Sequence, residues 1–175
     1  MRPNIRNAAL LLNRMPAIRH LLPVAVILAA GCASVPQPNR LADDSQEQAQ
    51  VQRTLYQIFD AAEKKDFNRL DGYHLYGPKF TKFAPEQPGR QDAAASRQGE
   101  HDGLSAINGL SMHANDLKID LFGDVAIATF IVDSHFKSGA DTVERKARST
   151  LVFVKDHSAW KIVHEHFSPL KPATP

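Results

Sequence analysis

The C-terminal half of the chain contains four runs of strand-forming residues separated by short turns. The runs cover residues 116–122, 125–136, 143–155 and 160–167. The first run alternates polar and apolar residues, and the other three runs are rich in β-branched and aromatic residues. Both patterns are typical of β-strands. Short turns between successive strands allow only antiparallel pairing of neighbours. The pattern therefore predicts a four-stranded antiparallel meander.

The hydrophobic period is different before this region. In residues 47–65, apolar side chains recur at spacings of three and four: Val51, Leu55, Ile58, Phe59 and Ala62. This spacing predicts an amphipathic helix, which Asp43, Asp44 or Ser45 would cap. A second short helix is expected at residues 66–71. Helices followed by a meander indicate an α+β fold, with the helices packed on one face of a curved antiparallel sheet.

The segment between these two regions has no clear period. Residues 76–103 contain several prolines and glycines and are predicted to be irregular, apart from a short extended piece at residues 80–83. Residues 104–110 are expected to form a brief helix.

Residues 1–31 have the order of features that defines a secretory signal. A leader with four arginines and no acidic residue precedes residues 21–30, an uncharged and mostly aliphatic run that is too short to span a bilayer as a helix. The Leu-Ala-Ala-Gly sequence before Cys32 resembles a bacterial lipobox. We therefore expect cleavage after residue 31 and lipid attachment at Cys32. The alternative is that Cys32 is an ordinary buried thiol after an N-terminal helix.

Lipid on Cys32 would exclude several classes of site. It is the only cysteine, so no disulfide, thiolate metal site or cysteine nucleophile would remain. The chain has 21 Lys+Arg and 19 Asp+Glu, and removal of four arginines with the leader leaves 17 against 19, a formal charge of −2. The basic excess therefore belongs to the leader, and nucleic-acid binding is not expected.

The rest of the chain divides into three parts. Residues 32–43 are rich in Pro, Gln and Asn and are expected to form a flexible tether. Residues 44–170 form the predicted domain, and residues 171–175 are a tail. Ala33, directly after the lipidated cysteine, favours a location in the cell envelope at the outer membrane, facing the periplasm.

The last two predicted strands resemble the closing hairpin of SnoaL-like members of the nuclear transport factor 2-like superfamily. These strands read RSTLVFVK (148–155) and WKIVHEHFSP (160–169). The turn FGDVA (122–126) and the helix end KKDF (64–67) resemble the same family, in the same order along the chain. The resemblance to the family covers residues 47–170. Together with the lipobox-like site at Cys32, it makes the chain similar to a SnoaL-like protein that is anchored as a bacterial lipoprotein.

The resemblance implies a cone-shaped fold in which the sheet wraps around the N-terminal helices and leaves a pocket at the open end. It also implies that two copies of the domain often pair through the sheet as a homodimer. It names no reaction, because the fold serves several enzyme classes, assembly hubs and binders. Ketosteroid-isomerase-like chemistry is disfavoured, because Ile58 and Phe83 fall at the positions of its tyrosine and base. The dehydratase chemistry of the family needs an oriented Asp–His pair, whereas Asp133 and His135 are neighbours on one strand.

Strict alternation along the last strand places His164 and His166 on the same face as Trp160. On a concave face, these imidazoles would line the pocket and could exchange protons near neutral pH; the alternative is a structural role. Arg148 could bind a ligand carboxylate or form a surface ion pair. The candidate pocket residues are Tyr56, Tyr73, Tyr76, His135, Arg148, Trp160, His164 and His166.

A His-x-His pair on a strand is also half of a zinc site. His135, His113 or His101 could supply a third ligand, but none stands at a diagnostic spacing, so neither a metal nor a cofactor is expected.

Three functions are consistent with these patterns. The first is a lipid-anchored envelope protein whose pocket binds a small, partly apolar ligand without catalysis. The second is a lyase or isomerase that uses His164 or His166 for acid–base chemistry. The third is a structural protein that assembles through its sheet face.

Overall fold

The computed structural model describes residues 40–170 of the chain, with side chains from residue 44 onward. The predicted signal, Cys32, the tail and most of the predicted tether lie outside these residues. The elements are α1 (Arg40–Glu63), α2 (Phe67–Gly72), β1 (Thr81–Phe83), α3 (Ala93–Ser105), β2 (Asn108–Phe122), β3 (Val125–Ser138), β4 (Asp141–Asp156) and β5 (Ala159–Pro169). Within the described range, no helix combines the length and the hydropathy needed to span a membrane.

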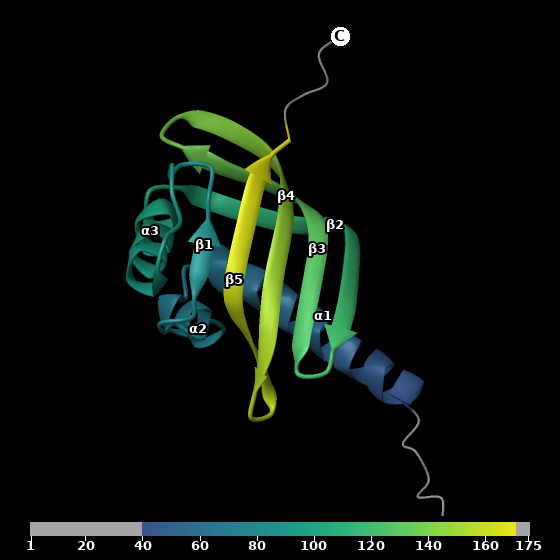
Figure 1. The fold of residues 1–175 in the computed structure, drawn as a ribbon. Coiled ribbons are helices and arrows are strands. Elements are labelled where there is room, and N and C mark those ends of the chain that lie inside the picture. The colour runs from purple at the N-terminus through teal and green to yellow at the C-terminus, as the bar shows by residue number, and fades with distance from the viewer. Residues whose placement is uncertain (1–39, 171–175) are drawn as a thin grey trace, which may run out of the picture. The chain divides into compact units, whose positions relative to one another are not determined.

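The five strands form one open sheet in the order β1-β5-β4-β3-β2 (Figure 1). Strands β2 to β5 pair antiparallel with their neighbours along the chain, which confirms the predicted meander. The extended piece predicted around Phe80 becomes β1, which pairs parallel to β5 with Thr81 opposite His164. The α+β class is therefore confirmed, with one parallel edge strand that the sequence did not predict.

Helix α1 supplies one side of the core. Its predicted apolar stripe is buried, and Leu55 and Phe59 join one cluster with Ala128 and Phe153 of the sheet. The helix begins at Arg40, earlier than predicted, so the cap expected at residues 43–45 was wrong. No proline or glycine interrupts residues 40–47, and the helix continues through them. It ends where Lys65 adopts a positive φ of 55°.

Helix α3 replaces a segment that was predicted to be mostly irregular. The Asp92 side chain caps it by accepting a hydrogen bond from the Ala95 amide at 2.9 Å. The brief helix predicted at residues 104–110 was also wrong, because α3 ends at Ser105 and β2 begins at Asn108.

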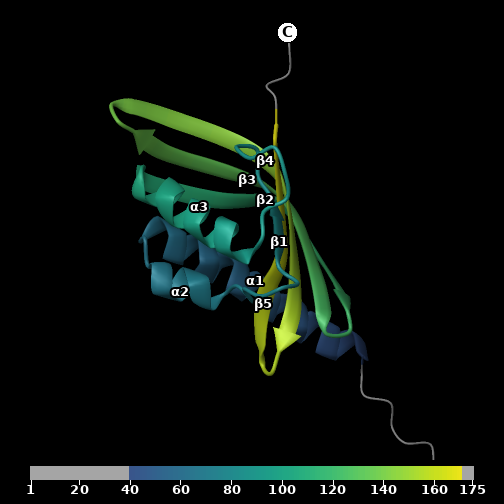
Figure 2. The ribbon, with the colours of Figure 1, turned by 60° about the vertical axis from the view of Figure 1, so that its left-hand side comes forward.

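All three helices lie on the same side of the sheet, as predicted (Figure 2). The pairing of β2 with β3 shifts register between Asn115 and Lys118, where Asp116 has a φ of 52°. Such irregularities let a strand bend. Strand β1 is the edge strand next to β5, and helix α3 lies at the same end of the sheet (Figures 1 and 2).

Candidate functional site

A β-bulge in β5 decides which of its side chains face the helices. Phe153 of β4 pairs with Ile162, but the next residue of β4, Val152, pairs with His164. Val163 is therefore an extra residue without a partner on β4. One extra residue reverses the face on which every later side chain of the strand lies.

The bulge places Glu165 and Phe167, rather than the two histidines, on the helix side. Glu165 is only 3% exposed, and Phe167 packs against the core, whereas His166 is exposed. The prediction that His164 and His166 share a face with Trp160 was therefore wrong.

The two histidines lie instead beside β1. His164 Nδ1 is 2.8 Å from Thr81 Oγ1, and the His166 ring is 5.9 Å from the Phe83 ring. Neither histidine lines any of the hollows described below. Acid–base chemistry through this pair consequently has no support in the structure.

Glu165 belongs to a buried cluster of four charged side chains from four parts of the chain. Lys82 of β1 places Nζ 2.8 Å from Glu165 Oε2 and 2.5 Å from Glu100 Oε1 of α3. His74, which follows α2, places Nε2 3.3 Å from Glu165 Oε1 and 3.9 Å from Glu100 Oε2. We call these residues, Lys82, His74, Glu100 and Glu165, the charged cluster.

The surrounding hydrogen bonds fix the proton positions on His74. Its Nδ1 lies 2.9 Å from the Leu70 carbonyl oxygen, which can only accept, so Nδ1 carries a proton. Its Nε2 faces carboxylate oxygens and can donate to Glu165 when it is also protonated. Burial alone would lower the pKa of His74, but Glu165 and Glu100 outweigh it and raise the pKa to about 8. His74 is therefore an imidazolium at neutral pH.

The two carboxylates differ in their environments. Burial and the neighbouring charge of Glu165 raise the pKa of Glu100 above its ordinary value. Burial also acts to raise the pKa of Glu165, but Lys82 and His74 outweigh it and lower the pKa. With both carboxylates ionised, two cations balance two anions, and the charged cluster has no net charge.

Tyr76 is the one predicted pocket residue that reaches this cluster. Its hydroxyl donates a hydrogen bond to Glu100 Oε2 at 3.0 Å, and its ring stacks on the His74 ring at 4.9 Å. Burial, followed by the charges of Glu100 and Glu165, raises the pKa of the hydroxyl, so Tyr76 remains neutral and acts as a donor.

Three members of the charged cluster have the donor types of a metal site. Ligand atoms of His74, Glu100 and Glu165 all lie within 4.8 Å of one another. The Lys82 ammonium, however, already contacts both carboxylates and provides the cation that they need. The histidines considered as metal ligands from the sequence are elsewhere; His101, for example, contacts Asp71 at 2.9 Å.

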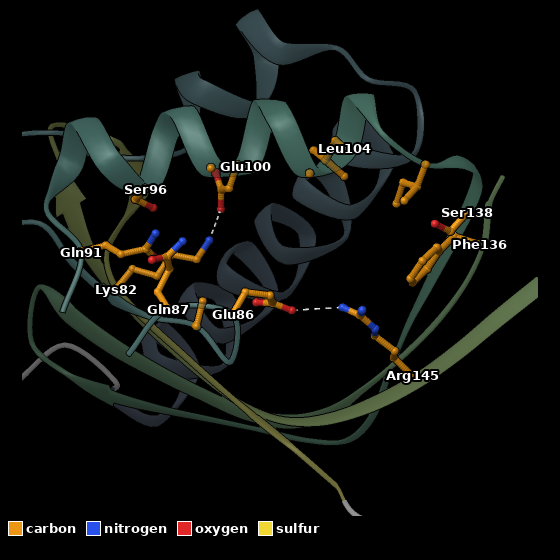
Figure 3. A pocket seen from close by; sticks show the side chains of 14 residues that line it. Lys82, Glu86, Gln87, Gln91, Ser96, Glu100, Leu104, Phe136, Ser138 and Arg145 are labelled. Carbon is orange, nitrogen blue, oxygen red and sulfur yellow. Dashed lines mark hydrogen bonds and ion pairs between the residues drawn. The ribbon is translucent and has the colours of Figure 1, made fainter. Parts of the chain in front are cut away.

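A hollow of about 430 Å³, the outer hollow, lies between α3, the loop after β1 and the β3–β4 hairpin. Figure 3 shows two different ends: Lys82, Gln91 and Ser96 gather at one, and Phe136 and Ser138 lie at the other. Arg145 stands at this second end, 3.0 Å from Glu86 and 5.4 Å from the centre of the Phe136 ring.

A smaller chamber of about 140 Å³, the inner chamber, lies deeper among α1, α2 and the sheet. Lys82, Glu100 and Leu104 line both spaces, so the charged cluster forms part of the wall between them. The other walls of the inner chamber are mainly apolar and include Phe59, Phe130, Leu151 and Phe167. The site thus combines a polar outer part with an apolar inner part.

The remaining predicted pocket residues do not gather around this site. His135 and Arg148 are exposed, and Arg145 borders the outer hollow in place of Arg148. Tyr56 is 42% exposed and lines a shallow hollow with residues of β2.

Tyr73 and Trp160 line a separate groove of about 240 Å³ beside α1. Trp160 is 3% exposed, and its indole N–H donates a hydrogen bond to Glu47 at 2.9 Å. It is therefore a core residue that also fixes the position of α1.

Comparisons with known proteins bear on the fold. The model of the family described as "SnoaL-like domain" matches residues 51–172. No curated protein sequence matches the chain.

Solved structures share the arrangement of helices and strands. A putative dehydratase of the NTF2-like family from Streptomyces avermitilis is 19% identical, covers 73% of this chain and 99% of its own, and has a TM-score of 0.67. An NTF2-like superfamily protein from Salmonella enterica is 15% identical, covers 74% of this chain and 95% of its own, and has a TM-score of 0.66. The CaMKII hub of S. rosetta is 24% identical, covers 70% of this chain and 96% of its own, and has a TM-score of 0.61. At these identities the likeness concerns the fold, and it agrees with the predicted cone of helices and curved sheet.

Proposed function

Because this chain belongs to the SnoaL-like domain family, we propose that its domain binds a small, partly apolar molecule in the outer hollow without transforming it. The observation that carries the proposal is the outer hollow itself. Its volume of about 430 Å³ falls within the range of small-molecule sites, roughly 300–1,000 Å³. Its wall joins apolar side chains, such as Leu104 and Phe136, to a few buried polar groups, which is the usual composition of such sites.

The charged cluster supports binding rather than catalysis. A general base needs a lone pair that is free to accept a proton from the substrate. Glu100, the carboxylate of the charged cluster that lines the outer hollow, already receives hydrogen bonds from Lys82 and Tyr76, and Glu165 is paired with Lys82 and His74. The charges of these groups compensate one another, and a buried network of this kind gives the wall a fixed shape.

Filling the outer hollow should abolish binding. We expect Leu104→Trp to weaken binding of the probe 2-naphthol to the full-length chain at least tenfold, because the larger indole would occupy the space. Ala94→Trp is the control, since Ala94 is exposed on the same helix. Binding is measured by titration in ¹H–¹⁵N NMR spectra. Equal affinity of the wild type and Leu104→Trp would contradict the proposed site.

We also propose that the protein is held in the cell envelope, at the outer membrane, by lipid on Cys32. The support is the sequence alone: a basic leader, an apolar run and a lipobox-like site in the required order. Intact-mass spectrometry of detergent-extracted protein tests it. We expect the wild type and the control Ser34→Ala to begin at Cys32 and to carry diacylglycerol, and Cys32→Ala to carry no lipid. A wild-type chain without lipid would contradict the proposal.

The outer face of the sheet supports the further proposal of a homodimer. Among residues 40–170, no helix covers this face, and it carries the half-buried side chains of Ile127, Ile131, Val152 and Val154. A second copy packed there would remove this apolar surface from water. Sedimentation velocity of the full-length chain in detergent should show twice the monomer mass, and a monomer would rule out this assembly.

A further inference from the structure

Two polar atoms in the wall of the outer hollow have no hydrogen-bond partner among the described residues. They are Ser96 Oγ and Gln91 Oε1, and both atoms are buried. Ser96 as a whole is 1% exposed. Buried polar groups are nearly always hydrogen-bonded, so two orphaned atoms in the wall of one hollow need an explanation.

Both residues are held in place by the backbone. Gln91 pairs with Lys82 through two backbone hydrogen bonds, of 3.1 and 2.9 Å, and Ser96 lies in the first turns of the capped helix α3. Figure 3 shows the two side chains at the same end of the outer hollow, next to Lys82 and Glu100. The backbone at both residues is therefore fixed before a ligand arrives, which lowers the entropic cost of binding.

The charges around the outer hollow are already balanced. Lys82 is paired with Glu100 and Glu165, and Arg145 is paired with Glu86. Beside Gln91 and Ser96, a charged ligand group would have to break the buried pairs of Lys82 or be buried without a counter-ion, and both are unfavourable. The Arg145–Glu86 pair is exposed, and Arg145 lies at the other end of the hollow. A neutral group that donates and accepts hydrogen bonds meets neither cost.

We infer that the outer hollow recognises a neutral head group, a primary amide or an alcohol, that donates a hydrogen bond to Gln91 Oε1 and exchanges one with Ser96 Oγ. The apolar body of the ligand then lies towards Leu104 and Phe136, at the other end of the hollow. This inference rests on the proposed binding function and names the chemical class of its ligand.

The test uses probes that share a phenylpropyl body and differ only in the head group. They are hydrocinnamamide, hydrocinnamyl alcohol, hydrocinnamate, phenylpropylamine and propylbenzene. Each is titrated into the full-length chain and followed by ¹H–¹⁵N NMR. We expect the amide and the alcohol to bind at least about fivefold more tightly than the other three, since each net hydrogen bond is worth roughly a two- to tenfold change in affinity.

The outcomes separate the two proposals. If no probe shifts the resonances of α3, the proposed binding function fails, and the inference fails with it. If propylbenzene or hydrocinnamate binds as tightly as the amide, the hollow binds ligands but the neutral head group is wrong. A preference for hydrocinnamate alone would assign recognition to Arg145 or Lys82.

Ser96→Ala provides a second, independent measurement. We expect it to weaken hydrocinnamamide binding about three- to tenfold and to leave propylbenzene binding unchanged. The melting temperature should stay the same or rise, because Ser96 Oγ has no hydrogen-bond partner within residues 40–170 to lose. A lower melting temperature together with unchanged amide binding would make Ser96 a structural residue and overturn the inference.

Discussion

Replacing Lys82 by methionine is expected to lower the free energy of unfolding at neutral pH by about 3–5 kcal/mol, the usual cost of removing one partner from buried ion pairs. Lys82 Nζ lies 2.5 Å from Glu100 and 2.8 Å from Glu165, and both carboxylates are largely buried. Without the ammonium, the two carboxylates would face each other with only His74 to compensate them. Urea denaturation followed by circular dichroism measures the loss.

Two comparisons make this result specific. Lys79→Met changes an exposed lysine close by in sequence and should alter the free energy of unfolding by less than about 0.5 kcal/mol. The double variant Lys82→Met/Glu100→Gln should be more stable than Lys82→Met. In the double variant the Glu165 carboxylate and the His74 imidazolium remain, and their charges balance. A double variant less stable than Lys82→Met would contradict this account of the charged cluster.

The effect of Lys82→Met should also depend on pH. Removing the ammonium should raise the folded-state pKa values of both carboxylates, because Lys82 lowers both; the pKa of Glu100 is already raised in the wild type and should rise further. A carboxylate with a raised folded-state pKa destabilises the protein when it is ionised, and the cost disappears as the pH falls through that pKa. The difference between Lys82→Met and the wild type should therefore shrink on acidification below neutral pH.

Trp160→Ala should have an effect of similar size, about 3–5 kcal/mol, because it opens a cavity in the core. Trp160→Phe keeps most of the ring but loses the hydrogen bond to Glu47, and it should cost less, about 1–2 kcal/mol.

Trp160 is the only tryptophan, so circular dichroism replaces fluorescence as the probe of unfolding. Phe122→Ala, at a side chain that is 64% exposed, should change stability by less than about 0.5 kcal/mol. A cost for Trp160→Ala as small as this control would mean that Trp160 is not part of the core.

The fold could be predicted wherever one face of an element is apolar. The stripe from Val51 to Ala62 and the strand runs after residue 116 each reflect burial of one face, and the structure confirms both. Helix α3 escaped prediction because its inward residues, Ser96, Glu100 and Leu104, line the hollow and are mostly polar. Its one local signal is the Asp92 cap followed by three alanines.

The site could not be predicted in the same way, because it depends on pairings between distant segments. Lys82, Glu100 and Glu165 lie in three different elements, and only the pairing of β1 with β5 and the position of α3 bring them together. The face on which His164 lies depends on a bulge that is visible only in its pairing with β4. Of the pocket residues chosen from the sequence, Tyr76 alone donates a hydrogen bond to the charged cluster.

The extra residue at Val163 also affects how β5 is to be compared with the corresponding strand of relatives. In a strand without this bulge, the same run of letters would turn His164 and His166 inward and Glu165 outward. An alignment that matches residues column by column would then equate side chains on opposite faces of the sheet. Roles assigned to this strand in one relative can therefore be transferred to another only after the bulges of both have been counted.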